Sequence, residues 1–142
     1  MLAHIEPTLN LFHFGLVVLI WLVQLVIYPS LRYADPQTFQ VWHRRYTDRV
    51  SFVVVPLMIG QLGLATLRVG LQWNAPETMQ LPAILVLTII VGCWAATFLV
   101  SVPIHTELQE RGWVPALIDQ LIVTNWIRTG LWNAVFLIDF LY

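Results

Sequence analysis

An apolar stretch near the C-terminus carries the most specific chemical signal in the chain. The segment TNWIRTGLW places the amide of Asn125, the guanidinium of Arg128 and two indoles within about two helical turns. An arginine deep in a membrane-crossing helix costs at least ~2.5 kcal/mol on insertion scales, so it needs compensation. Its candidate partners are a ligand anion, an aromatic face or a carboxylate reached through water: Trp94, Trp132, Asp119 and Asp139. We interpret Asn125 and Arg128 as catalytic donors that stabilise developing negative charge in a water-poor site.

Two histidines, His43 and His105, could form a second chemical centre. Imidazole ligates iron, copper or zinc, and it also transfers protons because it titrates near neutral pH. Glu107 could complete a metal site with them, although a solvated helix end also explains that carboxylate. Interfacial hydrogen bonds to backbone or headgroups would explain both histidines as well. Metal ligation, proton transfer and a structural role therefore stay open, and so does the cofactor, which could be iron, copper, zinc or none.

Polar and aromatic side chains recur at three- and four-residue spacing in every apolar segment, which places them on one helix face. A polar group in lipid is costly, so we expect these faces to point inward and build a pocket within the bundle. The pocket is expected to open toward the connections that carry most of the arginines. Its predicted substrate-binding residues are Gln24, Tyr28, Gln61, Trp94 and Trp132.

The elements that must position these side chains are four apolar segments. The chain of 142 residues is 58% hydrophobic and 11% charged, whereas ordinary soluble chains are about 45–50% and 25%. So few charges cannot cover a soluble domain of this size, and the apolar excess must face lipid. The segments cover about 9–31, 50–71, 81–103 and 116–142, each close to the ~20 residues that cross a bilayer core. The predicted fold is all-α: a polytopic membrane protein with one domain, 1–142, forming a four-transmembrane-helix bundle.

Arginine placement predicts the orientation of the bundle. Connections 32–49 and 104–115 lie on the same side and hold five of the seven basic residues, while connection 72–80 has only Arg68 nearby. The positive-inside rule then places the first and third connections in the cytoplasm and both termini outside. We also expect a short interfacial helix after Pro36 and a further turn of the third helix before Gly112.

Composition excludes several function classes. A net charge of −1 without a basic patch argues against nucleic-acid binding. The single Cys93 provides neither a disulfide framework nor a redox pair. A diiron-carboxylate centre is disfavoured because the four apolar segments contain no glutamate. The expected partners are membrane lipids and a hydrophobic small molecule.

Four segments resemble a family of small, mostly uncharacterised bacterial four-helix membrane proteins: QLVIYPSLRY, FQVWHRRYTDRVSFVVVPLM, VPIHTEL and TNWIRTGLW. The family is distantly similar to anthrone oxygenase-like membrane proteins. Its Gln-x-x-x-His/Tyr-Pro pattern is matched at Gln24 to Pro29, its loop histidine at His43, its Pro-x-His at Pro103 to His105, and its Asn-Trp-Ile-Arg-Thr at 125–129. Gln61 stands where the family often has glutamate, which weakens any scheme that needs a carboxylate there.

The resemblance implies a bacterial inner-membrane protein and oxidative chemistry, since anthrone oxygenases convert an anthrone to a quinone with molecular oxygen. The predicted function is a membrane-embedded oxidoreductase or oxygenase that binds an aromatic or quinone-like substrate, with His43 or His105 moving a proton. The alternative is a non-catalytic accessory subunit or ligand-binding module of a larger membrane complex. A homo-oligomer also stays open. A transporter is disfavoured because the chain lacks internal repeats and rings of charge.

Overall fold

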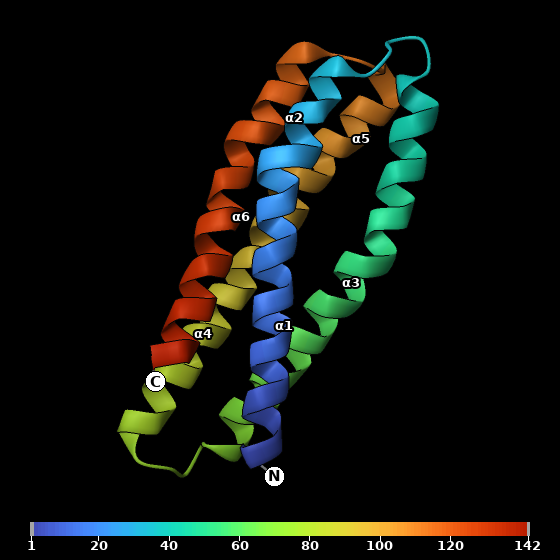
Figure 1. Cartoon of the computed structure of the whole chain (residues 1–142). Helices are drawn as coiled ribbons and strands as arrows, with labels where there is room; N and C mark the ends of the chain where they lie inside the picture. Colours follow the sequence, from blue (N-terminus) through green and yellow to red (C-terminus); the bar gives the residue numbers. More distant parts are fainter. Residues whose placement is uncertain (1, 142) are drawn as a thin grey trace.

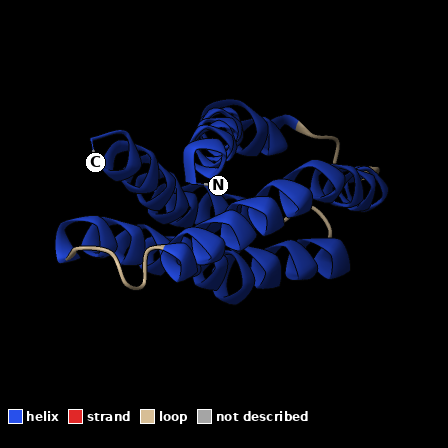
Figure 2. Ribbon diagram, turned by 90° about the horizontal axis from the view of Figure 1, so that it is seen from below, coloured by secondary structure: helices blue, strands red, loops and turns tan. Residues whose placement is uncertain are grey.

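Four helical rods make up the structure, a computed structural model that describes the backbone of residues 2–141 and the side chains of residues 5–141. Every regular element in this range is helical (Figures 1 and 2). The first rod joins α1 (Leu2–Leu22), the π-helical η1 (Val23–Ile27), α2 (Tyr28–Ser30) and the 3-10 turn η2 (Leu31–Tyr33). The second is α3 (Phe39–Leu71), the third joins α4 (Glu77–Ala96), the π-helical η3 (Thr97–Ser101) and α5 (Val102–Arg111), and the fourth is α6 (Pro115–Leu141).

All four rods are long and apolar enough to cross a membrane. Large apolar side chains on their outer surfaces are exposed, among them Phe52 at 82% and Leu99 at 75%. Such an apolar surface belongs in lipid rather than in water. The chain is therefore a multi-pass membrane protein, and the predicted all-α four-transmembrane-helix bundle is confirmed.

The rods form a closed ring in which α1 packs against α3 and α6, and α4 packs against the same two helices. The start of α1, the end of α6 and the turn between α3 and α4 lie toward one end of the bundle, which we call the terminal end (Figure 1). Connections 34–38 and 112–114 lie at the opposite end. We call this the arginine-rich end because five arginines lie on or beside those connections: Arg32, Arg44, Arg45, Arg49 and Arg111.

The helix boundaries differ from the sequence prediction at α3. This helix begins at Phe39, so residues 39–49 are its first turns and not a separate interfacial helix. Asp35 precedes it and accepts hydrogen bonds from the Gln37 backbone N–H (3.0 Å) and the Thr38 hydroxyl (3.1 Å). No residue between 39 and 49 is a helix breaker. The third rod ends at Arg111, immediately before the left-handed Gly112 (φ 81°), as the sequence predicts.

Two π-helical segments interrupt the first and third rods just before a proline. The backbone N–H of Tyr28 bonds the carbonyl of Val23, and that of Val102 bonds the carbonyl of Thr97. Pro29 and Pro103 follow these donors and have no N–H of their own, so neither can complete the regular i to i−4 pattern. The wider turn re-aims the side chains around it, a device frequently found at functional sites.

Candidate functional site

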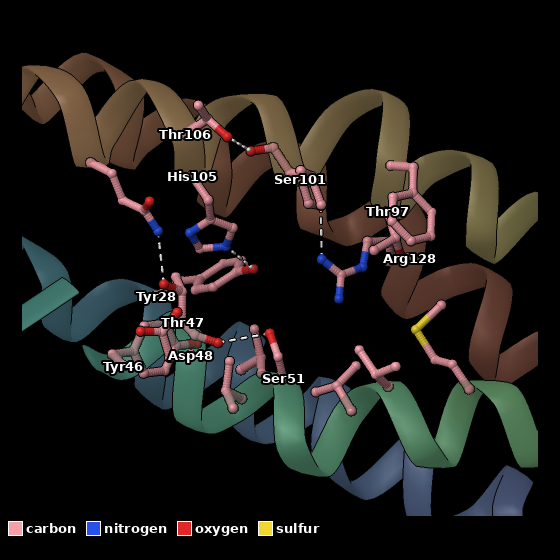
Figure 3. A pocket seen from close by; sticks show the side chains of 18 of the residues that line it. Tyr28, Tyr46, Thr47, Asp48, Ser51, Thr97, Ser101, His105, Thr106 and Arg128 are labelled. Atoms are coloured by element: carbon pink, nitrogen blue, oxygen red, sulfur yellow. Dashed lines mark hydrogen bonds between the residues drawn. The ribbon is translucent and has the colours of Figure 1, made fainter. Parts of the chain in front are cut away.

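A pocket of about 340 Å³ lies between α3 and the η3–α5 part of the third rod. Arg128 from α6 and Tyr28 from α2 reach it from the other two rods (Figure 3). Three exposed apolar side chains, Val55, Phe98 and Val102, lie on its lining. The pocket therefore opens sideways, on a flank of the bundle that faces lipid.

Arg128 points into this pocket as a buried cation without a counter-ion. Its Nη1 donates to Ser101 Oγ (2.7 Å), and its guanidinium carbon lies 5.3 Å from the centre of the Trp132 ring. Its Nε is buried and has no hydrogen-bond partner within the described part of the chain. No carboxylate of a described residue lies within ion-pair distance of it. Of the partners proposed from sequence, the Trp132 face is the one the structure provides, and donor capacity is left over for a bound anion.

The two predicted carboxylate partners of Arg128 are engaged elsewhere. Asp119 forms an exposed ion pair with Arg32, and Asp139 forms a buried one with Arg68. Each carboxylate therefore already neutralises another arginine, and neither forms a direct ion pair with Arg128.

Tyr28, His105 and His43 form a continuous hydrogen-bonded chain. The Tyr28 hydroxyl lies 3.0 Å from His105 Nε2, and His105 Nδ1 lies 3.0 Å from His43 Nε2. His43 is fully buried and stacked between the rings of Phe39 and His105, each 5.1 Å away. A neutral imidazole has one donor and one acceptor nitrogen, so the chain can run in either direction. Switching from one direction to the other moves a proton between the pocket and His43 Nδ1.

The remaining lining gives the pocket a polar and an apolar part. Toward the arginine-rich end lie the polar side chains Tyr46, Thr47, Asp48, Ser51 and Gln109, with Gln109 donating to Thr47 (2.8 Å). The apolar part is lined by Val23, Val54, Met58, Trp94 and Phe98. In Figure 3 Arg128 lies between the Tyr28–His105 pair and Thr97. A cation beside apolar walls suits an apolar molecule that carries an anionic or acidic group.

No known protein family, curated protein or solved structure matches this chain. The function of the chain is therefore inferred from the geometry of the site.

Of the nine predicted catalytic and substrate-binding residues, four line the pocket: Tyr28, Trp94, His105 and Arg128. His43 and Trp132 contact members of the lining: His43 hydrogen bonds to His105, and the Trp132 ring packs against the guanidinium of Arg128. Gln24 and Asn125 bond each other instead: Asn125 Nδ2 donates to Gln24 Oε1 (2.8 Å), and Gln24 Nε2 donates to the Ile122 carbonyl (3.2 Å). Both are buried and outside the pocket lining, where they join the first rod to α6.

Gln61 belongs to a second buried network, toward the terminal end. It accepts a hydrogen bond from Trp132 Nε1 (3.4 Å) and donates to His13 Nδ1 (2.8 Å). His13 Nε2 lies 3.2 Å from Asp139, which also binds Arg68. The sequence analysis did not predict this network. Its members lie on three different rods, and the pattern of one helix does not show which residues of another helix it meets. The only signal was a charge near the end of each of two facing helices, Arg68 and Asp139.

The candidate metal ligands are not brought together as one site. His43 and His105 face each other with the ring nitrogens that would bind a metal, whereas Glu107 bonds Arg111 on an exposed helix end. Among the described residues, no group of three His, Cys, Asp or Glu side chains is close enough to hold an ion. The pair instead has the geometry of a proton relay.

Proposed function

We propose that this protein is a membrane-embedded oxidoreductase of the oxygenase type, acting on a lipid-soluble aromatic substrate with an acidic oxygen. The observation that carries the proposal is a buried guanidinium with a spare donor and no carboxylate of a described residue within ion-pair distance, in a pocket that a tyrosine–histidine–histidine chain also reaches. An enzyme that makes and stabilises an aromatic oxyanion needs both a cation and a path for the proton.

Arg128 would hold the substrate oxygen, and the relay would receive the proton. As the substrate loses a proton to the Tyr28 oxygen, the Tyr28 proton moves to His105 Nε2 and the His105 Nδ1 proton moves to His43 Nε2. His43 Nδ1 is buried and has no partner among the described residues, so a water molecule reaching this atom would accept its proton, and every member of the chain would then end neutral. Arg128 lowers the barrier because negative charge builds up on the oxygen beside it. The narrow apolar walls keep bulk water from competing for that charge.

Molecular oxygen is the oxidant in this proposal. With an anthrone-like substrate, the deprotonated ring carbon would take one oxygen atom as a new carbonyl. The second oxygen atom would leave as water, together with the two hydrogens of the original methylene group. This chemistry is what the resemblance to small bacterial four-helix membrane proteins implies, since that family is distantly similar to anthrone oxygenase-like proteins.

We further propose a bacterial inner-membrane location, with the arginine-rich end in the cytoplasm and both termini outside. The substrate would then enter sideways from the inner leaflet, past Phe98 and Val102, and the relay would exchange its proton toward the cytoplasmic side.

Ligand binding and oxygen uptake by the purified full-length protein test the proposal. Wild type is expected to bind anthrone-like or quinol-like compounds and consume oxygen with them. Arg128→Gln is expected to weaken binding of the anion by about tenfold or more, since a charge-assisted hydrogen bond typically contributes about 1.5–3 kcal/mol. The matched control is Arg32→Gln, which removes the same charge from an exposed pair.

Absence of both binding and oxygen uptake across such compounds would contradict the proposal. Binding without turnover would contradict the enzymatic part and favour the alternative of a non-catalytic ligand-binding module in a larger membrane complex. In such a module the unpartnered Arg128 Nε would help to bind the ligand, and no reaction would follow.

A further inference from the structure

A basic and aromatic face runs along the first turns of α3, beside the pocket. Trp42, Arg45, Tyr46 and Arg49 are spaced three and four residues apart, which places them on one side of the helix. They line a surface hollow of about 540 Å³ together with Val50. The Trp42 and Tyr46 rings are stacked, with centres 5.6 Å apart and planes 6° from parallel. We call the side of α3 formed by these four residues the headgroup face. It combines two cations with a flat aromatic wall.

The two arginines of the headgroup face are not neutralised by the chain. Arg45 and Arg49 are exposed, and neither makes an ion pair or hydrogen bond with another described residue. The hollow between them contains no carboxylate. By contrast, Arg32 and Arg111 at the same end are paired with Asp119 and Glu107. Arg44 is likewise exposed and makes no ion pair with a described residue, but it and Arg45 line a neighbouring hollow that includes Asp48 and Glu110. Of the hollows lined by described residues, the one between Arg45 and Arg49 holds cations without a carboxylate.

The length of α3 places this face at the level of lipid phosphates. The helix has 33 residues and is about 50 Å long, whereas the hydrocarbon core is about 30 Å thick. Residues 50–67 carry no charge and span about 27 Å. They therefore fill the core, and residues 39–49 project into the headgroup layer. Stacked tryptophan and tyrosine rings are typical of that layer.

The surface below the headgroup face suits an acyl chain. Val53 lies one turn beyond Arg49 and is 53% exposed. Val50 is shared between the hollow and the substrate pocket, as is Tyr46. A lipid seated on the headgroup face would thus lie next to the pocket opening.

We propose that Arg45 and Arg49, with Trp42 and Tyr46, bind the phosphate headgroup of an anionic phospholipid such as phosphatidylglycerol. Guanidinium groups bind phosphate oxygens in a bidentate manner, so these arginines can hold a headgroup in one position. A long-range attraction between charges alone would not fix that position. The acyl chains follow α3 into the core over Val50 and Val53. This inference does not depend on the proposed enzymatic function.

Native mass spectrometry of the purified full-length protein, with phosphatidylglycerol or phosphatidylcholine added, tests the site. Wild type is expected to retain phosphatidylglycerol in preference to phosphatidylcholine. The double variant Arg45→Gln/Arg49→Gln is expected to lose about 30-fold in affinity for phosphatidylglycerol, since each basic residue near an anionic lipid surface contributes about fivefold. Phosphatidylcholine binding should be unchanged.

The matched control is Arg32→Gln/Arg111→Gln, which lowers the net charge by the same amount but removes arginines that already have carboxylate partners. It is expected to change phosphatidylglycerol affinity by less than about threefold. Helical content by circular dichroism shows that both variants are folded. Equal losses in the two double variants, or equal retention of the two lipids by wild type, would overturn the proposal. Displacement of the lipid by millimolar inorganic phosphate would also overturn it, because the site would then bind a free anion.

Discussion

At the scale of single residues, the buried side chains of this bundle divide into those whose hydrogen bonds are satisfied by the protein and those that are not. Gln61 bonds Trp132 and His13, and Asn125 donates to Gln24, although the Asn125 Oδ1 has no partner in the described chain. Arg128 bonds Ser101 and lies over the Trp132 ring, but its Nε has no hydrogen-bond partner and its charge has no carboxylate within ion-pair distance in the described chain. Since a buried cation without a counter-ion lowers stability, we expect a bound anion to complete the site.

The relay can be tested at His43, which lies behind the pocket and can be changed without altering its walls. His43→Phe keeps a flat ring between Phe39 and His105 but removes the nitrogen that meets His105 Nδ1. Ligand affinity should stay within about twofold of wild type, while oxygen uptake should fall by about 100-fold or more, a typical contribution of proton transfer.

His43→Gln serves as the comparison because an amide can hydrogen bond to His105 but cannot pass a proton on. It should be as slow as His43→Phe. Full activity in His43→Gln would mean that His43 only positions His105, and the relay would then be wrong.

At the scale of elements, the π-helical turn η3 positions a residue that holds Arg128 in the pocket. It ends at Ser101, the residue that accepts a hydrogen bond from Arg128, and Pro103 follows two residues later. Pro103→Ala supplies the missing N–H, so the turn can relax toward a regular α-helix and rotate Ser101 away from the pocket. We expect ligand affinity to fall by about fivefold to tenfold, the value of one hydrogen bond, with helical content unchanged.

Pro82→Ala is the control, since Pro82 lies inside α4 and is not preceded by a π-helical turn. Titration of ligand fluorescence or absorbance measures both variants. An unchanged affinity in Pro103→Ala would show that the proline does not hold the turn in place.

The terminal end of the bundle depends on a buried ion pair between two elements. Arg68 of α3 and Asp139 of α6 have side chains only 7% and 2% exposed. Asp139→Asn would leave Arg68 buried without a counter-ion, and we expect it to lower the free energy of unfolding by about 3–5 kcal/mol. Removing both charges in Arg68→Gln/Asp139→Asn should recover part of that loss.

Unfolding of the protein in mixed micelles by increasing denaturing detergent measures these changes. Asp119→Asn, which breaks an exposed pair, should cost less than about 1 kcal/mol. If Asp139→Asn proved no more damaging than Asp119→Asn, the buried pair would not stabilise the contact between α3 and α6.

At the scale of the whole molecule, the fold could be predicted from sequence because span length and apolarity are local properties. The site could be predicted only in part. Helical periodicity gives the residues on one face, and this was sufficient for Tyr28, Trp94, His105 and Arg128. It does not give the rotation of one helix against another, which decides that Gln24 faces Asn125 and not the pocket. The π-helical turns change that rotation further, and no periodicity rule anticipates them.

The orientation of the whole bundle follows from charge and can be measured independently of any ligand. An impermeant maleimide added to intact cells should label Asn74→Cys in the turn between α3 and α4, because that turn is predicted to lie outside. Gln37→Cys at the arginine-rich end should react only after the membrane is permeabilised. Both positions are exposed, and the native Cys93 is buried, so the wild-type chain provides the unlabelled background. The opposite labelling pattern would place the relay and the headgroup face on the outer side of the membrane. The substrate pocket would then exchange protons with the outside, and the proposed entry of the substrate from the inner leaflet would be wrong.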